Sequence, residues 1–299
     1  MTVLRRSYIH GFVERILEGL LLISAFASVT ILSLIFVFLF REGIPAFSEI
    51  RPSDFFFGSI WQVQAVEPSY GILPLVAGSA LVTVGAMTIA VPLSLMCAVY
   101  VAEVARPLLK EVVKPFIELL AGIPSVVYGF VALTVLADLT HQLTGSAYRL
   151  NALNGALILA VMVVPTIVSI SEDAITSVPR EYREAAYALG ADKWETTSKV
   201  VFPSALSGIM VAIMLGLGRA IGETMAVLMA TGNAPLLTFD ILSSVQTMTA
   251  VIAIEMGEVT FGSTHYHALF AVGLLLLVIT FFVNIAAEVL LRKFRSVRY

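Results

Sequence analysis

The chain has 299 residues, of which 59% are hydrophobic and 13% are charged, and its formal net charge is −3. The mean hydropathy is +0.94, and a soluble domain of this length cannot cover so much apolar surface with polar side chains. The composition therefore excludes a soluble domain and indicates one all-α bundle of several helices in a lipid bilayer, with no nucleic-acid partner expected.

Six stretches of about 18 or more mostly apolar residues predict membrane spans. The first is too long for the core of a signal peptide and lacks a convincing cleavage site, so we expect it to remain as an anchor. We expect residues 1–71 to hold the N-terminal segment, the first span and a loop, and residues 72–299 to form a domain of five spans. The predicted spans are residues 16–40, 72–101, 113–136, 152–170, 206–230 and 268–291.

Lysine and arginine alternate from one loop to the next. One side of the membrane carries 14 of these residues, the opposite side carries three, and one more lies inside the fifth span. Because cytoplasmic loops are enriched in lysine and arginine, both termini are expected in the cytoplasm. The loop 231–267 has neither residue and is expected outside. Within it, residues 241–254 are too short for a crossing and predict a re-entrant or interfacial helix.

Residues 181–203, EYREAAYALGADKWETTSKVVFP, form a charged, amphipathic connection between the fourth and fifth spans, within the loop 177–205. Gly190 is expected to end a first helix, since glycine accepts the left-handed backbone found at helix ends. Asp192 and Glu195 have the spacing of a capping box at the start of a second helix. The pattern therefore predicts two short helices that meet at a glycine.

The same stretch resembles the EAA loop of ABC importer permeases, which reads Glu-Ala-Ala, three residues, Gly, nine residues, Ile-x-Leu-Pro. The spacing is unbroken, and valine and phenylalanine replace the isoleucine and leucine. In that family the loop docks into a separate ATPase subunit, so the resemblance implies two ATP-binding subunits on the cytoplasmic side. The alternative is an interfacial amphipathic elbow. The matching residues are Glu184, Ala185, Ala186, Gly190 and Pro203.

The sequence lacks a phosphate-binding loop of the Gly-Lys-Ser/Thr kind, because none of its five lysines follows a glycine. We therefore expect that this chain is not an enzyme, and that ATP is bound and hydrolysed by a partner subunit. No cofactor is expected in the chain. No metal is expected either, since His265 and His267 have no cysteine or third histidine nearby in the sequence.

The fifth span contains two charges. Arg219 lies about 20 Å along a helix from the start of the span, beyond the middle of a hydrocarbon core ~30 Å thick. Glu223 follows four residues later, on the same face of a continuous helix. A charge at that depth costs roughly 2.5–3.5 kcal/mol, and a guanidinium fork matches two oxygens of a tetrahedral oxyanion. We expect an anion path, with a structural ion pair as the alternative. Gly216, Gly218 and Gly222 are expected to let another helix approach closely.

Three stretches, LGLGRAIGETMAV, LLAGIPSVVYGF and TMTAVIAIEMGE, resemble the permease of the phosphate ABC importer, of the PstC type. The sister PstA type continues with Ala-Pro where this chain has Met225 and Ala226. The likeness implies a six-span type I ABC importer permease bundle (MetI-like) with cytoplasmic coupling helices, in the bacterial inner membrane. It also implies that Arg219 and Glu223 take part in phosphate passage, with Thr224 a weaker candidate.

The resemblance further implies a second homologous permease, as a heterodimer, and an external phosphate-binding protein. Two alternatives remain. One is a permease for another oxyanion, such as molybdate or sulfate, and the other is an ion-coupled secondary transporter or a membrane scaffold. Two further predictions concern pairs of charged residues that are close in the sequence. Lys114 and Glu118 are expected to pair along one helix, and Glu255 and Glu258 are expected to form a solvated face.

Overall fold

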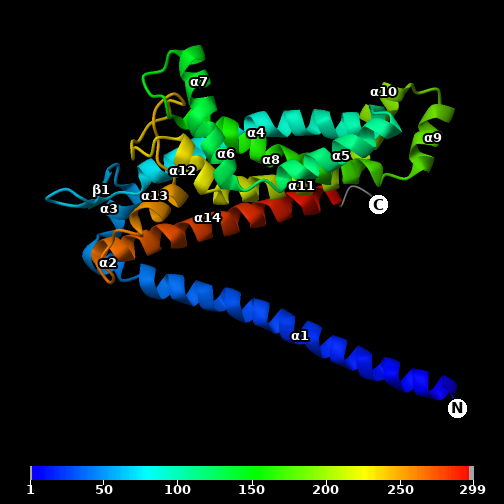
Figure 1. The fold of residues 1–299 in the computed structure, drawn as a ribbon, viewed down its shortest axis with the longest axis horizontal. Coiled ribbons are helices and arrows are strands. Elements are labelled where there is room, and N and C mark those ends of the chain that lie inside the picture. The colour runs from blue at the N-terminus through cyan, green and yellow to red at the C-terminus, as the bar shows by residue number, and fades with distance from the viewer. Residues whose placement is uncertain (1, 296–299) are drawn as a thin grey trace.

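The computed structural model describes residues 2–295, and it describes side chains for residues 17–289. Helices make up almost all of the described chain, and a two-residue antiparallel hairpin pairs Trp61 with Tyr70 (Figure 1). The elements are α1 (Thr2–Gly43), α2 (Ala46–Glu49), α3 (Pro52–Phe57), β1 (Trp61–Gln62), β2 (Ser69–Tyr70), α4 (Leu73–Val99), η1 (Tyr100–Val104), α5 (Pro107–Ala121), α6 (Ser125–Val131), η2 (Ala132–Leu136), α7 (Ala137–Thr144), α8 (Ala152–Thr176), α9 (Arg180–Ala188), α10 (Lys193–Thr196), η3 (Thr197–Val201), α11 (Phe202–Gly222), α12 (Met225–Ala230), α13 (Met248–Glu255) and α14 (Thr264–Arg295); η1, η2 and η3 are π-helical turns.

Six helical stretches of the described chain are long and apolar enough to cross a membrane, which confirms the predicted number of spans. Each is hydrophobic over at least 18 residues, and their order along the chain follows the prediction. The stretches are Leu17–Glu49, Leu73–Val104, Ser125–Thr144, Ala152–Thr176, Lys193–Gly222 and Thr264–Val289.

The helix α8 is the centre of the bundle. It packs against α4, α5, α11 and α12, and its span is 61% buried, more than any of the other five. Ile167 of α8 is fully buried, and a β-carbon added to Gly216 of α11 would lie 2.7 Å from its Cγ1 atom. Because only glycine allows this approach, α11 lies close against α8 at the depth of the predicted anion path.

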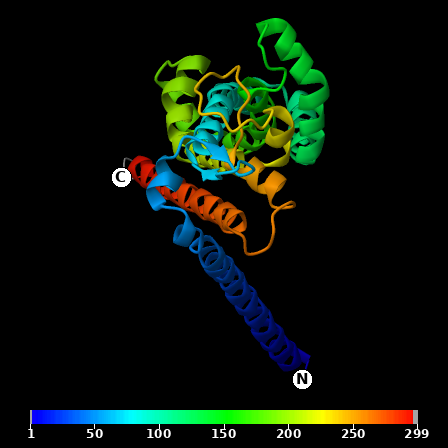
Figure 2. The same ribbon diagram turned by 90° about the vertical axis from the view of Figure 1, so that its left-hand side faces the viewer.

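The helix α1 diverges from the bundle (Figures 1 and 2). It touches α14 near its C-terminal end, where the rings of Phe38 and Phe270 meet edge to face with centroids 5.4 Å apart. None of the residues in its most apolar window is buried, as expected for a span that is hydrophobic on all sides. The start of α1 and the end of α14 lie toward the same end of the molecule as α9 and α10 (Figure 1).

The third span differs from its prediction. Instead of residues 113–136, the apolar helical stretch covers Ser125–Thr144, and α5 ends before it at Ala121. Pro124 has no N–H to donate and disfavours a helical residue before it, so the chain turns at residues 122–124. The preceding helix α5 is a separate, amphipathic helix that presents apolar side chains outward and lysines toward α8.

The fifth span is also interrupted, where one continuous helix over residues 206–230 is predicted. The helix α11 ends at Gly222, Glu223 has an extended backbone (φ −68°, ψ 134°), and α12 begins at Met225. The Glu223 carbonyl accepts a hydrogen bond from Thr249 Oγ1 (2.8 Å), and the Glu223 carboxylate accepts one from Ala226 N (3.1 Å). These bonds satisfy the backbone groups that the interruption frees. The prediction of one continuous helix over residues 206–230 is therefore wrong, whereas Glu223 still directly follows the last helical residue of α11, four residues beyond Arg219.

The loop 231–267 contains a shorter helix than predicted. Residues 241–247 are not helical, and α13 begins at Met248, where the Thr247 hydroxyl accepts the Ala250 N–H (3.3 Å) as an N-cap. A β-carbon on Gly78 of α4 would lie 2.4 Å from the Gln246 carbonyl oxygen, so this loop is pressed against α4. Close contact with the bundle replaces the helix predicted over the whole of residues 241–254.

Candidate functional site

The connection between α8 and α11 contains one short helix, α9, as predicted. The second predicted short helix is instead the start of a continuous helical stretch, Lys193–Gly222, which runs from α10 through η3 into α11. Gly190 has a φ of +87°, a left-handed conformation that glycine adopts at little cost, and it separates α9 from α10. The capping box is present: Glu195 N donates to Asp192 Oδ1 (2.7 Å), and Asp192 N donates to Glu195 Oε2 (3.3 Å). The loop is therefore an ordered elbow at one end of the bundle (Figure 1).

The residues of the predicted docking motif divide between two faces of α9. Ala186 is buried against the bundle, whereas Glu184 and Ala185 are exposed. Exposed aromatic and aliphatic side chains of Tyr187 and Leu189 accompany them, and Leu189 is 90% exposed. Pro203 lies in the first turn of α11, a position that tolerates the missing N–H. The elbow presents a mixed apolar and acidic surface, of the kind that a protein partner covers.

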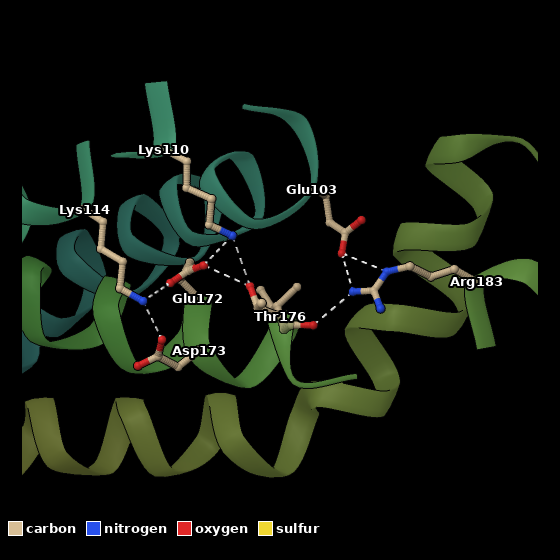
Figure 3. A network of polar contacts seen from close by, with 8 residues as sticks. Glu103, Lys110, Lys114, Glu172, Asp173, Thr176 and Arg183 are labelled. Atoms are coloured by element: carbon tan, nitrogen blue, oxygen red, sulfur yellow. Dashed lines mark hydrogen bonds and ion pairs between the residues drawn. The ribbon is translucent and has the colours of Figure 1, made fainter. Parts of the chain in front are cut away.

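Arg183 fastens α9 to two other elements (Figure 3). Its Nη2 and Nε atoms donate to Glu103 Oε1 in η1, at 2.6 and 3.3 Å. The same guanidinium donates to the carbonyls of Val178 (2.6 Å) and Ile175 (3.1 Å) at the end of α8. The sequence alone does not indicate this contact, because Glu103 lies 80 residues before Arg183.

A second ionic cluster attaches α5 to α8 (Figure 3). Glu172 is 2% exposed, and its two oxygens accept from Lys110 and Lys114, each at 2.8 Å. Lys114 also donates to Asp173 (2.6 Å), and these bonds, to Asp173 first and Glu172 second, raise the pKa of the Lys114 amine. The predicted pairing of Lys114 with Glu118 is wrong, since acidic groups on α8 are better partners.

Arg219 lies at the α11–α8 contact, half-buried, and its Nη1 donates to Thr166 Oγ1 at 3.1 Å. In the part of the chain that the structure describes, this is the one hydrogen bond of a group with five donors, and no carboxylate lies within ion-pair distance. The alternative of an intrachain ion pair with Glu223 is therefore not what the described residues form. The guanidinium is oriented by a hydroxyl and keeps most of its donors available.

Glu223 and Thr224 lie in the interruption between α11 and α12. One carboxylate oxygen of Glu223, Oε1, accepts from Ala226 N, and Oε2 has no hydrogen-bond partner among the described residues. Glu223 also lines a small cavity with the hydroxyl-bearing Ser79, Thr83 and Thr249. Thr224 donates weakly to the Gly222 carbonyl, at 3.4 Å. Both Glu223 and Thr224 are half-buried at a break in the span.

One face of α11 has no neighbour within the described chain. Val211 and Leu215 on it are exposed, and a β-carbon at Gly218 or Gly222 would meet no atom within 4 Å. The prediction of close helix packing is therefore confirmed for Gly216, whereas no described helix packs against Gly218 or Gly222. The open face adjoins Arg219.

The opposite end of the bundle differs from the expected solvated face. Glu255 is half-buried and accepts from the Trp61 indole N–H (3.2 and 3.3 Å), and its Oε2 lies 2.7 Å from His265 Nε2. Glu258 is exposed, as predicted. The cluster joins the hairpin β1–β2 to α13 and α14, so the expectation for Glu255 is wrong because a tertiary contact covers it.

Thr166 and Thr249 are functional candidates that sequence analysis did not select. Thr166 follows Pro165 inside the fourth span, and a hydroxyl beside a helix-disrupting proline was a usable signal. Thr249 lies in the loop 231–267 and meets Glu223 only through tertiary structure. Nothing in a single sequence points to that contact.

Comparison with known proteins gives the class of protein to which this helical bundle, its elbow and Arg219 belong. The family described as "Binding-protein-dependent transport system inner membrane component" matches residues 90–296 of this chain. The match covers more than half of the chain, so this protein belongs to that family of ABC importer permease subunits. Membership overturns the alternative of an ion-coupled secondary transporter.

Individual relatives are similar over most of their length. The "Probable ABC transporter permease protein YqgH" of Bacillus subtilis is 40% identical over 265 residues, which cover 88% of this chain and 84% of that protein. The "Phosphate transport system permease protein PstC" of Xylella fastidiosa is 36% identical over 264 residues, covering 82% and 80%. The PstC protein of Mesorhizobium japonicum is 36% identical over 247 residues, covering 76% and 75%. The resemblance to the PstC type is therefore confirmed.

Solved structures share the fold at low sequence identity. The alginate ABC transporter, solved with an alginate-bound periplasmic protein, matches with a TM-score of 0.62 and 16% identity over 94% of this chain and 96% of that chain. An inward-facing MetNI methionine ABC transporter matches with a TM-score of 0.55 and 19% identity over 75% and 94%. These matches confirm the predicted MetI-like fold, that of an all-α integral membrane permease.

Proposed function

We propose that this chain is the permease subunit of an ATP-driven importer of inorganic phosphate. The observation that carries the proposal is Arg219, a cation at the α11–α8 contact whose described partner is a neutral hydroxyl at 3.1 Å. Intramembrane charges usually face a cavity or a substrate path, and a guanidinium binds tetrahedral oxyanions through two N–H groups at once. The similarity to PstC proteins at 36% identity supports phosphate as that anion.

Glu223 gives a reason for selecting phosphate over sulfate. Near neutral pH phosphate still carries a proton, whereas sulfate does not. The Glu223 Oε2 atom, which has no described partner, would accept a hydrogen bond from that proton and would repel a fully ionised anion. Arg219 would balance part of the anion's charge, and Thr224 would lie at the edge of this path.

The proposed partners follow from the exposed surfaces. Two ATP-binding subunits would dock on the elbow through Glu184, Ala185 and the exposed side chains around them. A second, homologous permease would cover the open face of α11 and present its own arginine near Arg219. An external phosphate-binding protein would deliver the anion over the loop 231–267. Both termini would lie in the cytoplasm of a bacterial cell, a proposal that the distribution of lysine and arginine supports.

The mechanism would be alternating access. Closure of the ATP-binding subunits would move the elbow, and the paired permeases would switch from an inward-open to an outward-open state. The energy for transport would come from ATP hydrolysis by the partner subunits, so this chain would need no cofactor of its own.

The test is transport in liposomes by the complex of this chain with its partner permease, ATP-binding subunits and binding protein. Inorganic phosphate should stimulate ATP hydrolysis and should be taken up, while excess sulfate or molybdate should compete weakly. Stimulation by sulfate or molybdate, with none by phosphate, would replace the substrate and leave the transporter class intact. The name of the Bacillus subtilis relative states no substrate, so this competition decides between the oxyanions.

A further inference from the structure

The coupling helix α9 is held to the bundle by few contacts. It follows α8 after residues 177–179 and leads into the left-handed Gly190. Within the described chain, Arg183 is the one α9 side chain that forms a hydrogen bond or ion pair, and Ala186 is its one buried residue. The attachment of α9 therefore depends strongly on a single arginine.

The Arg183–Glu103 pair is largely shielded from water. The two side chains are 17% and 11% exposed, and both guanidinium contacts, at 2.6 and 3.3 Å, go to the same oxygen, Oε1. Charges held this way are screened much less than a surface pair. Glu103 belongs to η1, the π-helical end of the second span, so the pair joins α9 directly to α4.

The same guanidinium satisfies the end of α8. The last carbonyls of a helix have no partner in the helix, and a cation there is favoured by the helix dipole. Arg183 donates to the carbonyl of Ile175 (3.1 Å) in the last turn of α8 and to that of Val178 (2.6 Å) just after the helix. One side chain thus connects three elements: α9, the end of α8 and the end of α4.

We infer that Arg183 is a positioning residue that makes the coupling helix move as one body with α4 and α8. The inference rests on the proposed function, and it names the route by which movement at α9 reaches the anion site. From Ile175, α8 runs back nine residues, about 13 Å, to Thr166, which holds Arg219. Without this contact, α9 would pivot between Pro179 and Gly190 and leave α8 in place.

The test uses the assembled transporter in liposomes, with inorganic phosphate as the probe. The variants are Arg183→Ala, Arg183→Lys and Glu103→Gln. Arg149→Ala is the matched control, because Arg149 also pairs with a carboxylate, that of Asp138, but lies outside the elbow on which the ATP-binding subunits are proposed to dock. We expect Arg183→Ala to assemble and to hydrolyse ATP without phosphate at the wild-type rate. Phosphate moved per ATP hydrolysed should fall at least about tenfold, the scale expected when one partner of a shielded charge pair is removed. Arg183→Lys should be intermediate, and Arg149→Ala should match the wild type.

The ratio of phosphate moved to ATP hydrolysed separates positioning from stability. A merely structural arginine would change the yield and melting temperature of the complex but not this ratio, so an unchanged ratio in Arg183→Ala overturns the inference. If Arg183→Ala does not assemble, Glu103→Gln provides the test. Glu103→Gln retains the contacts of Arg183 with the carbonyls at the end of α8 and loses only the carboxylate charge on η1. An unchanged ratio of phosphate moved to ATP hydrolysed in Glu103→Gln also overturns the inference. A wild-type transporter that ignores phosphate refutes the proposed substrate instead, and the same comparison with sulfate or molybdate then decides the role of Arg183.

Discussion

Arg219 on α11 donates a hydrogen bond to the hydroxyl of Thr166 on α8, at 3.1 Å, where the two helices pack closely. The contact is close because Gly216 brings α11 against Ile167, one helical turn from Arg219. It orients a cation without neutralising it. Substitutions of Arg219, Thr166 and Glu172 therefore test separately the charge of this cation, its orientation and the packing of the helices around it.

Replacing Arg219 tests the charge. Arg219→Ala removes donors whose hydrogen bonds to an anion are worth about 1.5–3 kcal/mol, so phosphate uptake should fall roughly 10-fold to 100-fold. Arg219→Lys keeps the positive charge but loses the paired N–H groups of the guanidinium. Its phosphate uptake should lie between those of the wild type and Arg219→Ala. Arg149→Ala is the control, because Arg149 pairs with Asp138 on the exposed part of the bundle and should transport normally. Wild-type uptake by Arg219→Ala would refute the proposed anion path.

Replacing Thr166 tests the orientation. Thr166→Val removes the hydroxyl and keeps the shape, so Arg219 keeps its charge but loses its one described partner. A hydrogen bond of about 1 kcal/mol predicts a decrease in uptake of roughly fivefold, smaller than that of Arg219→Ala. Thr280→Val is the matched control, since among the described residues the Thr280 hydroxyl bonds only to the Leu276 carbonyl of its own helix. Equal uptake by the two valine variants would mean that Thr166 does not orient the guanidinium.

Replacing Glu223 tests selectivity. Glu223→Gln removes the negative charge and replaces one oxygen by a donor, so repulsion of fully ionised anions should weaken. We expect the preference for phosphate over sulfate to decrease, measured as the ratio of uptake rates with each labelled anion. The amide oxygen can still accept from Ala226 N, which preserves the start of α12. A variant with the wild-type ratio would remove Glu223 from the selectivity mechanism.

Replacing Glu172 tests the frame. Glu172→Ala leaves two lysines without their buried carboxylate, and breaking a buried pair costs about 3–5 kcal/mol, reduced here because both lysines are about one-third exposed. We expect a loss of about 2–3 kcal/mol, read as a fall of several degrees in the melting temperature of the detergent-solubilised protein. Lys199→Met, in the exposed pair with Glu195, should leave the melting temperature almost unchanged, because water screens this pair. Equal melting temperatures for the two variants would contradict this difference.

Much of the fold could be predicted from the sequence because its signals are local. Membrane spans appear as long apolar runs, and a bilayer requires the backbone groups of each run to form hydrogen bonds within that segment. The six membrane-spanning helices therefore follow from the apolar runs alone. The elbow is equally local: Gly190 and the capping box of Asp192 and Glu195 act over three or four residues. Arg219 could be selected because a charge inside a span is costly.

The errors occurred where contacts distant in sequence decide the local structure. The break at Glu223 is stabilised by Thr249, 26 residues later, and Lys114 bonds to acids about 60 residues away instead of to Glu118. Pro124 is a local signal for the turn before the third span, although the predicted span, residues 113–136, runs through it.

The sequence by itself determined that this is a six-span membrane protein with an elbow for a partner and a charge within a span, since hydropathy, spacing and residue type are properties of short segments. Only the tertiary structure decided that Arg219 meets Thr166 and not Glu223, and that Arg183 joins α9 to both α4 and α8. The physical reason is that a buried polar group must find a partner wherever packing brings one, and packing is a property of the whole bundle.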